Sequence, residues 1–260
     1  MTHELKMFFD TEFTGLYNGT KLLSIGAIIT YLDKSFGFYA ECTDHIDAFP
    51  SMDLPEETKK FIGKHVIPNL IYTNMSGMDD IQVYEQRIIP ELHNLEYTQV
   101  IDTYENCAIE FRKWIVFIIH NFIKTTKVGK LMISDGVNPL NMAKIVPVSD
   151  VMYYDMVLLM DFVKVSVPDD KVYRNVFTNV FVPFGHDISE DIRTKMCQFE
   201  KYYEAFDKSR LSIIEYLYET RILSDEQLDF ISYIASNAYR AHNSFYDALA
   251  IYMIHKLINE

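Results

Sequence analysis

The sequence predicts an α/β protein in which a mixed β-sheet lies between helices. The first 42 residues contain three segments of strand pattern separated by turns, and helical and strand patterns alternate after them. Hydrophobic residues make up 49% of the 260 residues and charged residues 23%, a balance that supports a folded core. No repeat or Gly/Ser-rich linker divides the chain, so we expect a single domain over residues 1–260.

The three N-terminal segments predict an antiparallel unit. Residues 5–9 are a short apolar run, residues 21–30 a longer one that contains Gly26, and residues 35–42 alternate in polarity. The Tyr-Asn-Gly-Thr sequence at residues 17–20 is typical of a turn. Strands joined by such short connections pair antiparallel, so we expect a three-stranded antiparallel sheet here.

Helical patterns follow this unit. A proline at residue 55 with two glutamates after it predicts a helix through about residue 65, because proline and acidic side chains are favoured in a first turn. Residues 105–124 have helical apolar spacing, and residues 130–134 predict a buried strand. Further helices are expected at residues 149–163, 209–223 and 244–258 and after a capping box at residues 224–227. The C-terminal part is therefore expected to be mainly helical.

Charge is unevenly distributed along the chain. The 24 Lys and Arg stand against 37 Asp and Glu, a net charge of −13, which excludes binding of nucleic acid mainly through a basic surface. Residues 79–110 hold eight acids and one base, Arg87, and so more than half of the net charge. We predict an acidic insertion at about residues 72–110. A solvated face is the simpler interpretation, and a protein-binding surface is the alternative.

Three features predict a soluble protein of the cytoplasm, or of the host cytoplasm if a virus encodes it. The cysteines Cys42, Cys107 and Cys197 are odd in number and far apart, which fits neither a disulfide framework nor zinc-binding spacing. The N-terminus lacks the apolar core of a signal peptide. The longest apolar run, residues 114–119, is far shorter than the roughly 20 residues that cross a bilayer, so no membrane partner is expected.

Two acidic clusters suggest chemistry. Asp10 and Glu12 stand where the first predicted strand ends, and side chains two residues apart on a strand point the same way. Adjacent carboxylates repel each other, so a cation between them would stabilise the pair. His242 lies five residues before Asp247, near the start of the last predicted helix, and an imidazole can act as a general base.

Each motif alone also fits a structural role. Asp10 and Glu12 could be a solvent-facing pair at a hairpin end, and His242 could be a surface residue that caps a helix. A further carboxylate is needed between the two clusters. Asp135 directly follows a predicted strand, and Asp155 lies early in a predicted helix whose other face is apolar. Periodicity does not decide between these two.

Taken in this order, the motifs resemble those of the DEDDh superfamily of 3′→5′ exonucleases, and in particular the ribonuclease AS type and its phage-encoded relatives. The DTEFTG sequence that begins at Asp10 is similar to the first motif, and the His242-x4-Asp247 spacing is similar to the third. Ser244 stands where the third motif commonly has alanine. The likeness covers most of the chain and is thin between about residues 72 and 150. It implies a ribonuclease H-like fold with three antiparallel strands followed by parallel strands.

The second motif and the metal ligands are implied by the same resemblance. The Tyr154-Asp-Met-Val-Leu sequence is similar to the second motif and favours Asp155, with Asp135 as the alternative. The strand predicted at residues 130–134 ends about twenty residues before this motif, a longer separation than is usual in the family. Two ions, Mg²⁺ or Mn²⁺, are implied. The implied ligands are Asp10, Glu12, Asp155 and Asp247.

The implied activity is 3′→5′ hydrolysis of RNA more than of DNA, with release of nucleoside 5′-monophosphates. The negative net charge favours a short single-stranded 3′ end over a long duplex. His242 is the implied general base. The segment after the first motif contacts the terminal nucleotide in such enzymes, which assigns Phe13, Thr14, Gly15 and Leu16 to substrate binding. Phe13 could stack on a base, and core packing is the alternative for Phe13 and Leu16.

The resemblance also implies a homodimer. A function of another class is an acidic nuclease-fold protein that mimics nucleic acid and blocks a host RNA-processing protein, which the acidic stretch suggests. Such a protein has no need of His242 or Asp10, whereas an exonuclease needs both. Stabilisation by divalent ions is expected of the enzyme alone.

Overall fold

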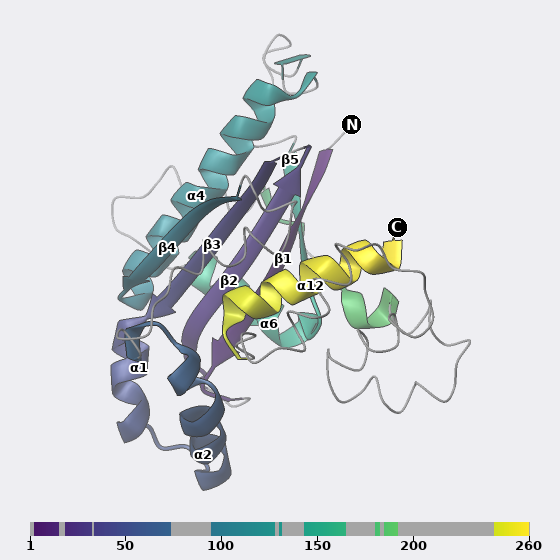
Figure 1. Ribbon diagram of the computed structural model, residues 1–260. Helices are drawn as coiled ribbons and strands as arrows, with labels where there is room; N and C mark the ends of the chain where they lie inside the picture. Colours follow the sequence, from purple (N-terminus) through teal and green to yellow (C-terminus); the bar gives the residue numbers. More distant parts are fainter. Residues whose placement is uncertain are drawn as a thin grey trace, which may run out of the picture.

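A six-stranded mixed sheet with helices on both faces forms the framework of the protein (Figure 1). The computed structural model describes residues 3–15, 19–32, 34–73, 95–127, 130–131, 143–164, 180–182, 185–191 and 242–259. The strands are β1 (His3–Phe13), β2 (Leu22–Tyr31), β3 (Lys34–Cys42), β4 (Leu95–Asp102), β5 (Ala143–Ser149) and β6 (His186–Asp187). Their order is β4-β3-β2-β1-β5-β6, and β2 alone runs antiparallel to the others. The expected α/β class and ribonuclease H-like arrangement are confirmed.

The predicted antiparallel unit of β1, β2 and β3 is present, and its first strand is longer than expected. β1 continues to Phe13, so Asp10 and Glu12 lie within the paired part of the strand, opposite Gly26 and Ser24 of β2. On its other side, pairing with β5 ends at Phe8. The two carboxylates are therefore held by a β-ladder on one side only.

Four of the expected helices are present. The helices are α1 (Thr43–Ala48), α2 (Glu56–His65), α4 (Tyr104–Thr125), α6 (Met152–Lys164) and α12 (Ser244–Asn259), with 3₁₀ turns η1 (Phe49–Ser51) and η2 (Ile67–Asn69). The short helix α1 was not predicted. The helices expected at residues 209–223 and after residue 224 lie outside the described residues. No described helix is long and apolar enough to span a membrane.

One sequence expectation about strands was wrong. Residues 130 and 131 are helical, and the strand that precedes α6 is β5. β5 contains Pro147, which cannot donate a hydrogen bond to a β-ladder. On the side of β5 away from β1, the Ile145 carbonyl accepts a hydrogen bond from the Val182 amide. The backbone nitrogen of Pro147 lies on this same side, and the pairing of β5 with β6 begins only at the next residue, Val148. The sequence analysis assigned no strand between residues 72 and 110, where β4 lies and pairs in parallel with β3.

The alternating side chains of β1 separate an apolar face from the face that carries the carboxylates. Met7 and Phe9 belong to a core formed with α4 and α6, in which Phe38 of β3 packs against Phe111 and Trp114. Phe8 points to the opposite face, which α12 covers (Figure 1). Since Asp10 and Glu12 have the same parity as Phe8, they point toward α12.

Candidate metal centre

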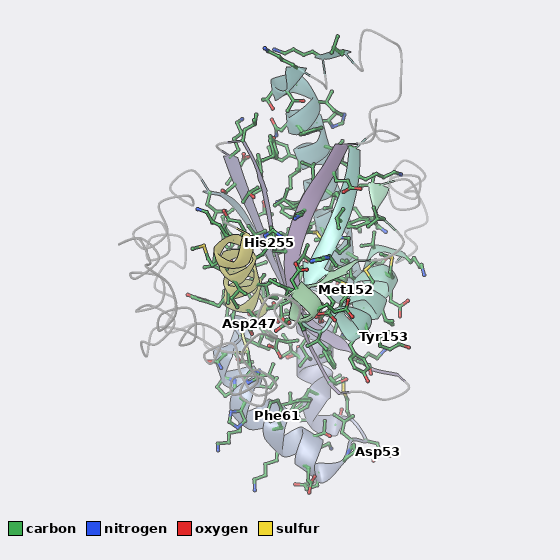
Figure 2. All side chains as sticks on the ribbon, turned by 90° about the vertical axis from the view of Figure 1, so that its right-hand side faces the viewer. Asp53, Phe61, Met152, Tyr153, Asp247 and His255 are labelled. Atoms are coloured by element: carbon green, nitrogen blue, oxygen red, sulfur yellow. The ribbon has the colours of Figure 1, made fainter. Side chains whose placement is uncertain are left out.

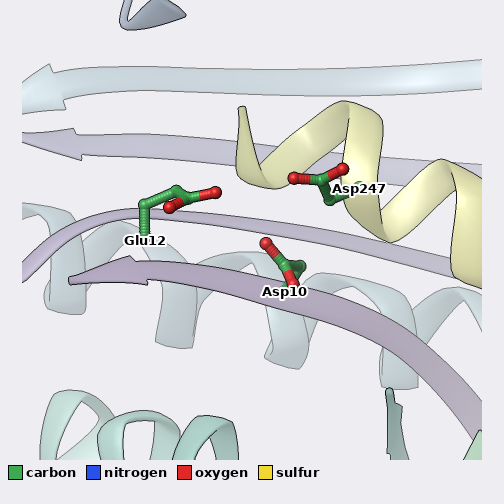
Figure 3. Close-up of side chains that lie close together, drawn as sticks. All are labelled: Asp10, Glu12 and Asp247. Carbon is green, nitrogen blue, oxygen red and sulfur yellow. The ribbon is translucent and has the colours of Figure 1, made fainter. Parts of the chain in front are cut away.

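Three carboxylates meet between the central strand and the last helix. Figure 3 shows Asp10 and Glu12 of β1 and Asp247 of α12 pointing toward one another. One oxygen from each lies within 4.8 Å of the others. Asp10 and Asp247 are buried, and the Glu12 side chain is 12% exposed. The sequence motifs at the two ends of the chain therefore come together in one site.

The close approach of α12 to the sheet depends on a glycine opposite Asp10. A Cβ atom on Gly26 would lie 2.3 Å from the Cα atom of Phe245, so only glycine leaves room for the first turn of the helix. Two ladder positions away, opposite Glu12, the hydroxyl groups of Ser24 and Ser244 form a buried hydrogen bond of 2.9 Å. The serine that stands where the resembling family commonly has alanine thus ties α12 to β2.

Asn243 sets the start of α12. Its side-chain oxygen accepts from the Phe245 amide at 3.2 Å, which makes it the N-cap residue. Its amide nitrogen donates to the Tyr39 hydroxyl and to the Asn69 carbonyl, both at 3.0 Å. One buried side chain therefore joins the helix, β3 and the end of η2, and it holds Asp247 one turn further along α12.

The same network continues to a buried glutamate. The Tyr39 hydroxyl donates to Glu41, whose carboxylate also accepts from the amides of Ile71 at 2.5 Å and Tyr72 at 2.7 Å. Burial raises the pKa of Glu41 above its ordinary value of 4.5. The pKa of Tyr39 is also raised, by burial first and then by the charge of Glu41. This network fixes the chain that follows α2.

A second carboxylate cluster shares Asp10 with the first. Oxygen atoms of Asp10, Asp150 and Asp155 lie within 4.8 Å of one another. Asp150 directly follows β5, and Asp155 lies in the first turn of α6. The pairing of β1 with β5 ends at Phe8, so β5 does not cover Asp10. The start of α6 can therefore bring Asp155 next to Asp10.

Hydroxyl groups hold Asp155 in place. Thr11 donates to one carboxylate oxygen at 2.5 Å, and Ser149 donates to the other. The Ser149 hydroxyl also accepts from the Val151 amide at the start of the helix. The carboxylate of Asp155 is thus oriented by hydroxyl groups of both β1 and β5.

The structure places Asp155 beside Asp10, whereas Asp135 lies outside the described residues. The long separation expected between strand and second motif is absent, because β5 ends at Ser149, six residues before Asp155. Sequence reasoning missed Asp150. Asp150 directly follows β5, in the way that Asp135 was expected to follow a strand at residues 130–134. Assigning the strand to residues 143–149 would therefore have identified Asp150 as a candidate.

His242 lies at the edge of the first cluster. Its backbone has a φ of 63°, and its amide donates to Asp247 at 3.0 Å. Its Nδ1 atom is 3.8 Å from an oxygen of Glu12, and its side chain is 41% exposed. The ring therefore lies beside the carboxylates and in contact with solvent. It also contacts Phe61 and His65 of α2, with ring centroids 5.3 Å and 6.1 Å away.

The predicted substrate segment has a structural role in the turn after β1. Phe13 is partly buried and packs against the core, which is the alternative that the sequence left open. Thr14 is buried, and its amide and hydroxyl both bond to the backbone of Lys21. Gly15 has a φ of 121°, a conformation that favours glycine. Leu16 lies outside the described residues, and the substrate contacts of this segment stay predictions.

The chemistry of the donors fits a hard divalent cation. Two unit charges 4.8 Å apart repel by about 3.5 kcal/mol at an effective dielectric constant near 20. Carboxylates gathered this closely are stabilised by a cation, and oxygen-only donor sets suit Mg²⁺ and Mn²⁺. Asp10, Glu12 and Asp247 could hold one ion and Asp10, Asp150 and Asp155 another.

The fold and this site define an α/β protein whose ribonuclease H-like sheet carries a carboxylate cluster on its central strand. No protein-family model matches the chain, and comparison with curated proteins finds no similar sequence.

Proposed function

We propose that the protein is a metal-dependent 3′→5′ exonuclease that releases nucleoside 5′-monophosphates from single-stranded ends, with RNA preferred over DNA. The observation that carries the proposal is the meeting of Asp10, Glu12 and Asp247 on a ribonuclease H-like sheet. Asp155 at a second cluster and His242 beside Glu12 add to it. This arrangement supplies donors for two cations and a nearby proton acceptor.

Each residue has a role in the proposed reaction. Asp10 would contact both ions, because it belongs to both clusters. Bound divalent ions supply charge stabilisation at the scissile phosphate and lower the pKa of an attacking water. His242 accepts the proton of that water and passes it to solvent, to which its ring is open. The bond from its backbone amide to Asp247 keeps the ring near the metal ligands.

Charge supports a short single-stranded substrate. The chain carries a net charge of −13, and two divalent ions would reduce this to about −9, which still repels a long polyanion. Contacts of the ions with one phosphate, together with stacking of unpaired bases, do not require a basic surface. Preference for RNA rests on the resemblance to the exoribonucleases alone.

A time course with a 5′-labelled single-stranded RNA oligomer and Mn²⁺ tests the proposal. We expect the wild type to shorten the oligomer from its 3′ end and to release nucleoside 5′-monophosphates. Asp10→Ala should lose this activity by about 10³-fold or more, equivalent to about 4 kcal/mol of transition-state stabilisation. Asp161→Asn, an exposed change on α6, is the matched control and should keep the activity.

Three further outcomes decide details of the proposal. Equal rates on matched DNA would remove the preference for RNA and keep the exonuclease. His242→Gln should reduce the rate 10²- to 10⁴-fold if the ring is the general base. Intact RNA and DNA with every divalent ion tested would contradict the proposal as a whole.

A further inference from the structure

Helix α2 presents an aromatic surface beside the candidate metal centre. Figure 2 shows Phe61 on α2, below Asp247. Phe61 is 50% exposed, and its ring lies against His65 and His242, with centroids 5.0 Å and 5.3 Å away. His242 is in turn 3.8 Å from Glu12. A continuous row of rings therefore leads from the carboxylates out to solvent.

Phe61 lies outside the small core that α2 forms with β2. The buried side of α2 is formed by Ile62, and the following Val66 joins the same small core with Leu23 of β2. Half of the Phe61 side chain is exposed to solvent. Its exposed ring face can stack on a planar aromatic ligand, and the neighbouring rings of His65 and His242 extend the same surface.

Basic side chains flank this surface. Lys60 and Lys64 are exposed and lie one helical turn apart. Phe61 and His65 have the same spacing, so the two lysines run alongside the two rings on the surface of α2. The acids of α2, Glu56 and Glu57, lie in its first turn, whereas His65 and Lys64 lie in the last turn, which adjoins His242. Positive charge is thus concentrated near the site of a chain whose net charge is −13.

We infer that α2 binds the single-stranded nucleic acid next to its reacting end: Phe61 and His65 stack on bases, and Lys60 and Lys64 contact phosphates. The inference rests on the proposed function and names where the substrate strand lies. Stacking accepts every base and needs no net positive charge, since all bases present a π-face. The two lysines supply local attraction for phosphates within reach of the rings.

Phe61→Trp gives a direct test of stacking. The chain has one tryptophan, Trp114, which is buried in the core, so a new indole at residue 61 reports a separate fluorescence signal. The probe is a single-stranded RNA pentamer in Ca²⁺, which takes oxygen ligands without supporting rapid hydrolysis. We expect the pentamer to quench the new signal and an abasic pentamer to quench it much less. Phe117→Trp is the control, because Phe117 is similarly exposed, at 43%, on α4 across the sheet.

Kinetics give a second readout. Phe61→Ala should raise KM for the RNA pentamer about 10-fold, the size of one lost base stack, whereas Phe117→Ala should leave KM unchanged. The double change Lys60→Gln and Lys64→Gln should lower the slope of log affinity against log salt by about 1.4, or about 0.7 for each phosphate contact. Lys124→Gln with Lys127→Gln, also exposed, is the control of equal charge.

The outcomes separate this inference from the proposed exonuclease. RNA cleavage by the wild type with no quenching at residue 61 and an unchanged KM for Phe61→Ala overturns the role of α2 and leaves the exonuclease intact. Base-dependent quenching without any cleavage supports the role of α2 and overturns the exonuclease. Neither quenching nor cleavage overturns both.

Discussion

Gly26 lies so close to Phe245 that a Cβ atom on Gly26 would be 2.3 Å from the Phe245 Cα atom. Gly26 is also the ladder partner of Asp10, so the glycine that leaves room for α12 lies opposite the carboxylate shared by both clusters. The contact links the packing of the last helix to the position of Asp247. Removing the space at Gly26 is therefore expected to affect both the stability of the protein and the position of Asp247 in the candidate metal centre.

Gly26→Ala should destabilise the protein by about 1–3 kcal/mol, since backbone atoms of α12 must move to admit the methyl group. Gly63→Ala is the matched control. A Cβ atom there meets nothing within 4 Å, and alanine is the better helix former, so a gain of about 0.5–1 kcal/mol is expected. Urea unfolding followed by circular dichroism measures both, and equal stabilities of the two variants would contradict the close contact.

Asn243→Ala should cost about 2 kcal/mol or more, because the helix loses its cap and the side chain no longer joins Tyr39 to Asn69. Asn243→Ser should recover roughly 1 kcal/mol of this loss, since serine is also a good N-cap residue but is too short for both outer contacts. Thermal unfolding of the two variants gives the comparison. If serine recovers nothing, capping is not the main contribution of Asn243.

Mg²⁺ or Mn²⁺ should raise the melting temperature of the wild type. At a free ion concentration 100 times Kd the expected gain is about 2.7 kcal/mol per site. Asp10→Asn should be more stable than the wild type in EDTA, because one charge leaves the crowded cluster, and should gain less from the ions. A wild type that the ions do not stabilise would favour the alternative of a nucleic-acid mimic.

Glu41 should make stability depend on pH. The pKa of this buried carboxyl is raised above its ordinary value of 4.5, so the folded state keeps a proton that the unfolded state releases. The contribution of Glu41 is fully present below pH 4.5 and is lost as the pH rises through the raised pKa. Unfolding of the wild type and of Glu41→Gln at several pH values should show that the wild type loses more stability over this window. Parallel pH profiles of the two proteins would exclude this role.

Local patterns were sufficient for most of the fold. The apolar run of β2 and the helical spacing of α4 are properties of neighbouring residues, so both elements could be predicted from the sequence. β4 and β5 were not predicted, because their places in the sheet depend on pairing with strands that are distant in the sequence.

The spacing of the motifs could be read from the amino-acid sequence. So could the two-residue separation that puts Asp10 and Glu12 on one face of a strand. Tertiary structure decided which residues join them. Asp150, the Gly26 contact and the rings of α2 reach the site through pairing and packing between segments far apart in the chain. The distances between such segments depend on how all the strands and helices pack together, so they cannot be read from the periodicity of a single segment.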